Sequence, residues 1–250
     1  GRPWDLPEFN DPQFDSYHDI NGVRYFHIQH PSSQNKEQQV YQEEAVTALK
    51  QYLQLLKPSV VMAASNWENA LPAAIAAREL GLPFFYEVRG FWEITRASIE
   101  PAWHNSEEFH YQVKMETSIA QNADQVFTLN HFMREELVRR GVDEAKIELV
   151  PNGISQLPDL SQPPKLTRQD LGITSQYVVG YVGSFTQYEG LGYLLRACAQ
   201  LRKRGIGLSL LLVGSSNPVG VGNKQCKYSL QLKEIAVQNN FSKHLFMPGR

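Results

Sequence analysis

A glycine-containing segment in the second half of the chain has the residue types of a phosphate-binding loop. Residues 180–191 read GYVGSFTQYEGL, an apolar strand pattern that runs through Gly183 and leads into a helix pattern after Gly190. Backbone N–H groups of such a loop, at the start of a helix, approach a phosphate closely. The segment has neither the Gly-Lys-Ser/Thr of a Walker A loop nor the G-x-G-x-x-G of dinucleotide-binding folds. A phosphate site and a purely structural turn are therefore both open at this point.

Polar and aromatic residues also follow two predicted strands in the first half of the chain. Residues 66–68 (NWE) come directly after an apolar run at 60–65, and residues 89–93 (RGFWE) come after a run at 84–88. Parallel strands of one sheet end at the same edge, and α/β sheets bind their ligands at that edge. We therefore expect the chemistry of the first half on these two loops.

Strand and helix patterns alternate along the first 150 residues. The predicted strands are residues 23–28, 60–64, 84–88, 125–129 and 146–150; the predicted helices are 34–56, 71–80, one that opens at a capping box starting with Asn105, and 130–141. Strands that are separated by helices pair in parallel through right-handed crossovers. The sequence thus predicts an α/β fold with a doubly wound parallel sheet.

A proline-containing connector at 155–165 interrupts this alternation, which then restarts. We predict a first domain at 1–154, a linker at 155–175 and a second domain at 176–250 with about three strands. A doubly wound sheet usually has about five or six strands. The second domain is therefore expected to be the first half of a larger one, and the first domain, which starts without Met, to lack its first strand and helix.

Composition excludes several function classes. The net charge is 24 − 26 = −2, so the chain as a whole has no positive field for DNA or RNA. With 42% hydrophobic and 20% charged residues it is globular, and its apolar runs are too short to span a bilayer. Two cysteines, Cys198 and Cys226, form no disulfide framework, which favours the cytoplasm.

No metal or cofactor site is predicted. His27 and His30 are the nearest to a metal-ligand pair, but positions three apart on a strand face opposite sides of the sheet. No third ligand is near them in the sequence, whereas a zinc site needs at least three protein ligands.

Several motifs together resemble the retaining family 4 glycosyltransferases of the GT-B fold. In order along the chain they are ENALPAA at 68–74, PFFYEVRGFWE at 83–93, Ala-Asp at 123–124, VPNGI at 150–154, and the glycine loop leading into LLRA at 194–197. The resemblance covers nearly the whole chain. It implies two Rossmann-like domains facing a cleft, with the acceptor held mainly by the first and a nucleotide-sugar donor mainly by the second, and metal-independent transfer with retention at the anomeric carbon.

On the donor side, the resemblance places the diphosphate against Gly183, Ser184 and Gly190, and Glu189 is a further predicted donor-binding residue. Many family members have Arg and Lys where this chain has Ser184 and Glu189. A carboxylate repels a phosphate, so Glu189 does not inherit the role of the lysine. Glu189 is expected to face a sugar hydroxyl, to pair with an arginine, or to be a solvated residue favoured by the helix dipole.

On the acceptor side, the resemblance places Arg89 at the end of a strand where many family members have a His. Its guanidinium is suited to bind phosphate and to replace the lost positive charge, so Arg89 is the predicted catalytic residue. Pairing with Glu87 or Glu93, merely to shape the loop, is the alternative.

Six residues of the two strand-end loops are predicted acceptor contacts. They are Asn66, Trp67, Glu68, Gly90, Trp92 and Glu93. The tryptophans would stack on sugar rings and the polar side chains would hydrogen-bond to hydroxyls. The alternative for both tryptophans is that they pack over the edge of the sheet.

The resulting hypothesis is a glycosyltransferase that moves a sugar from a nucleotide-diphosphate sugar to a glycan or lipid-linked acceptor, in cell-surface polysaccharide synthesis. The enzyme would act in the cytoplasm, with peripheral contact at the inner membrane face. The E-x7-E acids of the family are expected beyond Arg250, so the 250 residues alone should transfer little sugar. A non-catalytic nucleotide- or glycan-binding relative and a nucleotide-sugar epimerase are the alternatives.

Overall fold

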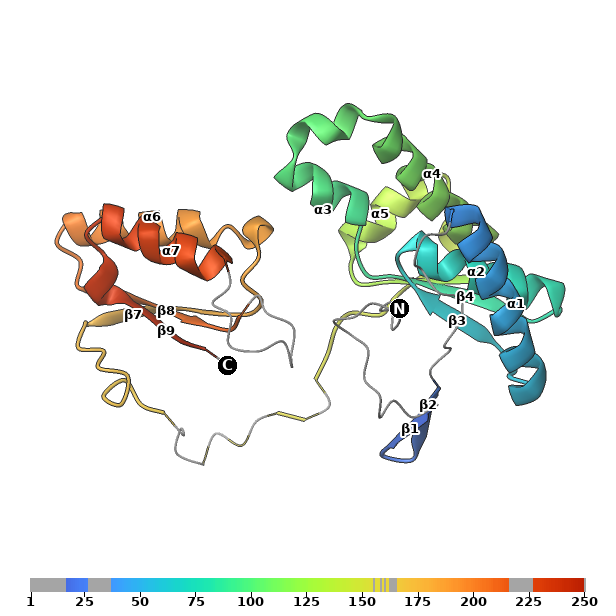
Figure 1. Cartoon of the computed structure of the whole chain (residues 1–250), viewed down its shortest axis with the longest axis horizontal. Coiled ribbons are helices and arrows are strands. Elements are labelled where there is room, and N and C mark those ends of the chain that lie inside the picture. Colours follow the sequence, from blue (N-terminus) through green and yellow to red (C-terminus); the bar gives the residue numbers. More distant parts are fainter. Residues whose placement is uncertain are drawn as a thin grey trace. The chain divides into compact units, whose positions relative to one another are not determined.

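The computed structural model describes residues 17–26, 37–154, 166–215 and 227–249, together with residues 156, 157, 159 and 161. The chain divides into two compact units, Gly1–Ile154 and Ser155–Arg250, each built around its own sheet (Figure 1). The predicted strand at 23–28 and the pair His27 and His30 extend beyond the described residues.

A small hairpin opens the described part of the first unit. Strands β1 (Tyr17–Ile20) and β2 (Val23–Phe26) pair antiparallel. Asn21 and Gly22 join them with φ angles of 54° and 81°, the left-handed pair that a two-residue hairpin turn requires.

Four parallel strands form the main sheet of the first unit, in the order β3-β4-β5-β6. They are β3 (Val61–Ala64), β4 (Phe84–Val88), β5 (Gln125–Thr128) and β6 (Ile147–Leu149). The helices of this unit are α1 (Gln38–Leu56), α2 (Trp67–Glu79), α3 (Trp92–Ile99), α4 (Glu107–Asn122) and α5 (His131–Arg139), with short 3-10 turns at Pro101–Asn105 and Glu144–Lys146. Each strand predicted between residues 60 and 150 is confirmed to within one residue at each end.

Two helix starts differ from the prediction. Helix α2 begins at Trp67 rather than at residue 71, so Pro72 lies within the helix. Helix α4 is capped by Ser106, whose hydroxyl accepts the Phe109 N–H at 3.1 Å, and the predicted cap Asn105 ends the preceding 3-10 turn. Ser is a strong N-cap residue, so the shift of one residue has an evident cause.

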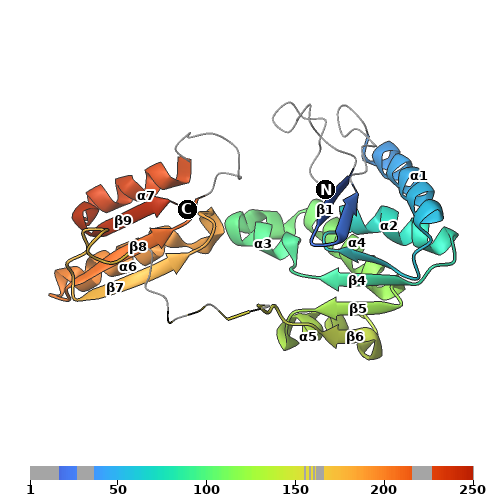
Figure 2. The ribbon, with the colours of Figure 1, turned by 90° about the horizontal axis from the view of Figure 1, so that it is seen from below.

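Right-handed crossovers between strands in this unbroken order place the connecting helices on one face of the sheet. Figures 1 and 2 show α1 beside α2, with α2 covering β3 and β4. The alternate residues Phe84, Tyr86 and Val88 of β4 point into this layer and are buried. The described strands are therefore one wing of a Rossmann-like sheet, with its core under α2 and α4.

The second unit repeats the plan with three parallel strands in the order β7-β8-β9. They are β7 (Tyr177–Val182), β8 (Leu208–Val213) and β9 (Leu245–Gly249), with helices α6 (Leu191–Lys203) and α7 (Lys227–Gln238) and 3-10 turns at Gln187–Glu189 and Ser242–His244. Helices α6 and α7 lie side by side on one face of the sheet (Figure 1). Their apolar residues bury Leu210 and Leu212 completely. The predicted α/β fold with Rossmann-like parallel sheets is thus confirmed.

No helix within the described ranges combines the length and the apolar character that a membrane span needs.

Candidate functional site

The two predicted loops of the first unit lie together at the carboxyl edge of its sheet. Strands β3 and β4 are neighbours, with Ala64 opposite Glu87. Beyond them, the Ser65 N–H donates to the Glu87 carbonyl at 2.8 Å, and the Arg89 N–H donates to the Ser65 hydroxyl at 3.1 Å. The structure therefore joins residues 66–68 to residues 89–93.

Arg89 forms an ion pair at this edge. Its Nε donates to Glu87 at 2.8 Å and a second guanidinium nitrogen lies 2.6 Å from the same oxygen, while 63% of the Arg89 side chain is exposed. The hydrogen bond and the charge of Glu87 raise the pKa of Arg89, so the guanidinium stays charged. The pairing alternative is observed, and the exposed remainder of the guanidinium still faces solvent.

Asn66 and Glu68 also lie at this edge and contact each other. The Asn66 amide donates to the Glu68 carboxylate at 3.3 Å. Glu68 is exposed in the first turn of α2, where the helix dipole favours an acid. Gly90 has open space around its Cα, so no close approach demands a glycine there.

The two tryptophans have different environments. Trp67 is 3% exposed and packs edge-on against Tyr111 of α4, with ring centroids 5.7 Å apart. Trp92 is 57% exposed at the start of α3. The packing interpretation therefore holds for Trp67, and Trp92 is the one that is free to stack on a ligand.

Glu93 lies away from the solvent edge. It is fully buried, and its carboxylate is 2.8 Å from Arg140, which is itself 6% exposed. Arg140 also bonds Glu136 at 2.7 Å and lies over the Phe91 ring at 4.3 Å. An acceptor in solvent does not reach a carboxylate so placed. The expectation of direct contact by Glu93 is corrected to a role in holding the 89–93 loop.

A second buried acid lies behind this edge and was not predicted. Glu116 of α4 accepts the Trp67 N–H at 2.7 Å and the hydroxyl of Tyr86. Burial, chiefly, raises the pKa of Glu116, and burial followed by the neighbouring Glu116 charge raises that of Tyr86. The sequence did hold a signal, because position 116 lies seven residues after Phe109 on the apolar face of the helix.

In the second unit, the glycine loop is shaped by close backbone contacts. The Gly183 N–H donates to the Val213 carbonyl at 3.1 Å, and the Tyr181 hydroxyl donates to the Ser184 carbonyl at 2.9 Å. A Cβ on Gly183 would lie 2.7 Å from that hydroxyl, and one on Gly214 would lie 1.8 Å from the Gly183 carbonyl oxygen. Glycine is therefore required at position 214, where the clash is with backbone and φ is 144°, whereas a side chain at position 183 would have to displace the Tyr181 hydroxyl.

The loop ends at the N-terminus of α6. Gly190 is its N-cap with φ 69°, and no side chain caps the helix. The first N–H groups of a helix have no partners within it. In this loop the Gly190 N–H donates to the Gln187 carbonyl at 3.2 Å and the Tyr193 N–H donates to the Gly190 carbonyl at 2.9 Å, whereas the N–H groups of Leu191 and Gly192 have no backbone acceptor among the described residues. These two donors and the positive end of the helix dipole lie beyond the carboxyl end of β7, which is an arrangement suited to an anion.

Glu189 pairs with a tyrosine, which was not among its expected partners. Burial first, and then a hydrogen bond with the Glu189 carboxylate, raise the pKa of Tyr181. The Tyr181 hydroxyl donates to the Ser184 carbonyl at 2.9 Å, so Glu189 lies near a hydroxyl that is already bonded to the loop.

Within the described ranges, no three His, Cys, Asp or Glu side chains gather as metal ligands would.

Comparison with known proteins identifies the family of the chain. The family model for the glycosyl transferase 4-like domain matches residues 7–153, more than half of the chain. The chain belongs to the glycosyl transferase 4-like family. The matched range includes both strand-end loops of the first unit, residues 66–68 and 89–93. No curated protein sequence matches it.

Solved structures similar to this glycosyl transferase 4-like chain are GT-B proteins. Anabaena HepE (Alr3699) in complex with UDP-glucose has a TM-score of 0.60 at 18% identity, over 82% of this chain and 51% of HepE. The lipopolysaccharide outer core galactosyltransferase WaaB, in its apo form, has a TM-score of 0.54 at 17% identity, over 87% of this chain and 51% of WaaB. S. aureus MnaA, solved with UDP, has a TM-score of 0.52 at 14% identity, over 85% of this chain and 53% of MnaA. The likeness shows the GT-B fold, and the chain spans about half the length of the structures that it matches.

Proposed function

We propose that the chain is part of a glycosyltransferase that moves a hexosyl group from a nucleoside-diphosphate sugar to a glycan or lipid-linked acceptor, with retention at the anomeric carbon. The uncapped α6 N-terminus behind Gly183 is the observation that carries this proposal. Membership of the glycosyl transferase 4-like family supports it, as does the UDP-glucose in the complex of the GT-B relative HepE.

In this reaction the bond between the anomeric carbon and the diphosphate oxygen breaks, and a bond from an acceptor oxygen to that carbon forms. The nucleoside diphosphate leaves with the electron pair, and the acceptor hydroxyl releases its proton. The rate depends on donors that stabilise the charge that develops on the diphosphate. The backbone N–H groups beyond Gly183 and Gly190, rather than the missing Arg and Lys side chains, would supply this stabilisation.

Arg89 is the proposed catalytic cation. It is charged, largely exposed, and oriented by Glu87 at the carboxyl edge of the first sheet. Asn66, Glu68, Gly90 and Trp92 would hold the acceptor at that edge, with no metal ion or cofactor required. The lipopolysaccharide activity in the name of WaaB supports a cell-surface polysaccharide role, at the inner membrane face of the cytoplasm.

Transfer is tested with the protein in extracts of the cell that makes it, supplied with UDP-[14C]glucose and the lipid fraction. We expect labelled glycolipid, loss of at least tenfold in rate on Arg89→Ala, and NMR coupling constants that show a retained anomer. Arg139→Ala is the matched control, because Arg139 is also an exposed arginine paired with a glutamate.

Two other results of this assay would refute the proposal. UDP-sugar binding without turnover would select the non-catalytic relative, and conversion of the UDP-sugar in the absence of any acceptor would select an epimerase. That the 250 residues alone transfer little sugar stays a prediction for the same assay.

A further inference from the structure

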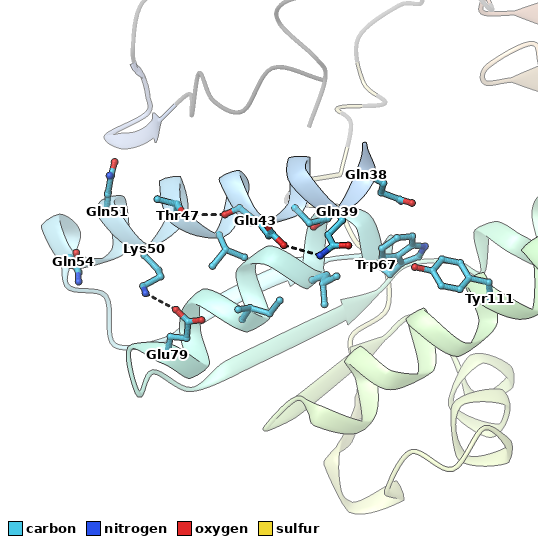
Figure 3. A pocket seen from close by; sticks show the side chains of 14 residues that line it. Gln38, Gln39, Glu43, Thr47, Lys50, Gln51, Gln54, Trp67, Glu79 and Tyr111 are labelled. Atoms are coloured by element: carbon cyan, nitrogen blue, oxygen red, sulfur yellow. Dashed lines mark hydrogen bonds and ion pairs between the residues drawn. The ribbon is translucent and has the colours of Figure 1, made fainter. Parts of the chain in front are cut away.

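A groove runs between α1 and α2 of the first unit, and Trp67 of the 66–68 loop is among the residues that line it. It has a volume of about 840 Å³, within the range of ligand pockets. Figure 3 shows Trp67 and Tyr111 at one end and the pair Lys50 and Glu79 at the other. The groove is therefore large enough for a molecule of several sugar units and has an aromatic end.

The lining of the groove is rich in amide side chains. Five glutamines line it, namely Gln38, Gln39, Gln42, Gln51 and Gln54. An amide both donates and accepts hydrogen bonds, as the hydroxyl groups of a sugar do. Val46, Leu71 and Ile75 add an apolar wall. This mixture suits a ligand that has apolar faces and a rim of hydroxyl groups.

Charge at the groove argues against an anionic ligand. Lys50 is the cation among the described lining residues, and its Nζ is 2.5 Å from the Glu79 carboxylate. The remaining acid, Glu43, accepts a hydrogen bond from the Gln39 amide at 3.0 Å. Since the positive charge is already neutralised, a neutral ligand is favoured over a phosphate.

Two buried polar atoms at the aromatic end have no hydrogen-bond partner. They are the indole Nε1 of Trp67 and the amide Oε1 of Gln42, on side chains that are 3% and 8% exposed. The other end of the Gln42 amide is fixed, because its Nε2 donates to the Glu68 carbonyl at 3.0 Å. One atom is a donor and the other an acceptor, so a hydroxyl-bearing ligand satisfies both. Buried polar groups are rarely left unpaired, which makes this pair informative.

We propose that the α1–α2 groove binds a neutral glycan, with Trp67 and Gln42 as its buried polar contacts and Tyr111, which is 45% exposed, as its stacking face. This site is separate from donor binding and requires no transfer activity. An amphipathic helical peptide fits less well, because amides replace the continuous apolar stripe that such a helix needs.

The test is a nitrogen-15 NMR titration of the full chain with maltotetraose, cellotetraose and chitotetraose at millimolar concentration. The chain has four tryptophans, and Trp67→Phe identifies the indole signal of Trp67. At least one of these neutral oligosaccharides should shift that signal in a saturable way. Inorganic phosphate should not shift it.

Variants then locate the binding. Gln39→Ala with Gln54→Ala should weaken it about fivefold or more, the effect of lost hydrogen bonds. The matched control is Gln231→Ala with Gln238→Ala, two exposed glutamines of α7. The proposal is overturned if no oligosaccharide shifts the Trp67 signal, if an amphipathic peptide does so instead, or if both glutamine pairs change the affinity equally.

Discussion

The two sheet edges of this chain are built by different physical means. The first unit positions its edge with charged side chains, above all the buried pair Glu93 and Arg140 and the buried acid Glu116. In the second unit the loop is shaped by backbone contacts at Gly183 and Gly214, and its buried polar residue in the described ranges is Ser209. Charge therefore fixes the predicted acceptor side, and close backbone packing fixes the predicted donor side.

The largest effect is expected at Arg140. Arg140→Met leaves Glu93 buried without its partner, which should lower the free energy of unfolding by about 3–5 kcal/mol. All four tryptophans precede residue 154, so fluorescence-detected urea unfolding follows the first unit. The double variant Glu93→Leu/Arg140→Met should recover most of the loss. Failure of the double variant to recover it would show that the ion pair is not the cause.

The next largest effect is expected at Gly214 of the second unit. Gly214→Ala places a Cβ 1.8 Å from the Gly183 carbonyl oxygen and should lower the stability of the second unit by roughly 3 kcal/mol. Hydrogen exchange of the β7–β9 amides measures this. Gly180→Ala is the control, since it meets no atom within 4 Å. Equal protection in both variants would refute the backbone account of the loop.

A smaller effect is expected in the pH dependence of stability at Glu136. The hydrogen bond from Arg139, chiefly, lowers the pKa of Glu136 below its ordinary value of 4.5. The native state therefore binds the proton of the Glu136 carboxyl less tightly than the unfolded state does. The stabilisation that the ionised Glu136 gives the fold is present above pH 4.5 and is lost as the pH falls through the lowered native pKa. Glu136→Gln should lower the urea midpoint at pH 7, with a difference that shrinks in acid. A constant difference would contradict this assignment.

Glu116 should show the opposite sign. Burial raises its pKa, so its contribution to stability is present at low pH and is lost as the pH rises from the ordinary value through the raised native pKa.

The smallest effect is expected at Tyr181. Tyr181→Phe removes the hydrogen bond to the Ser184 carbonyl and should cost the second unit about 1 kcal/mol. Exchange of the loop amides should rise more than that of β8. A uniform rise along the whole unit would indicate lost packing rather than a lost loop contact.

The strands and the place of the loops could be predicted from sequence. Apolar runs such as 84–88 are bounded by Pro or Gly, which marks the strands. Because parallel strands end at the same edge of a sheet, the order of strands and helices along the chain is enough to predict that the loops lie at the carboxyl edge. The short helix α3 is not evident from the sequence because eight residues carry little periodicity, and α2 begins at Trp67, four residues before the predicted start at 71.

The partners of the site residues could not be predicted. Glu93 meets Arg140, and Tyr86 meets Glu116, across elements that are distant in the sequence. Such pairs depend on how helices pack on the sheet, which periodicity does not specify. Glu189 was expected to find an arginine, a sugar hydroxyl or solvent, whereas the pKa of Tyr181 is raised in part by the Glu189 carboxylate, a neighbour that the sequence did not indicate.

The central claim is that the backbone of the glycine loop binds a diphosphate. The most direct test is a nitrogen-15 NMR titration of the chain with millimolar UDP, with uridine as the control without phosphate. We predict saturable shifts of the amide signals of Ser184, Leu191 and Gly192 with UDP and none with uridine. Absence of these shifts, or equal shifts with uridine, would contradict the claim.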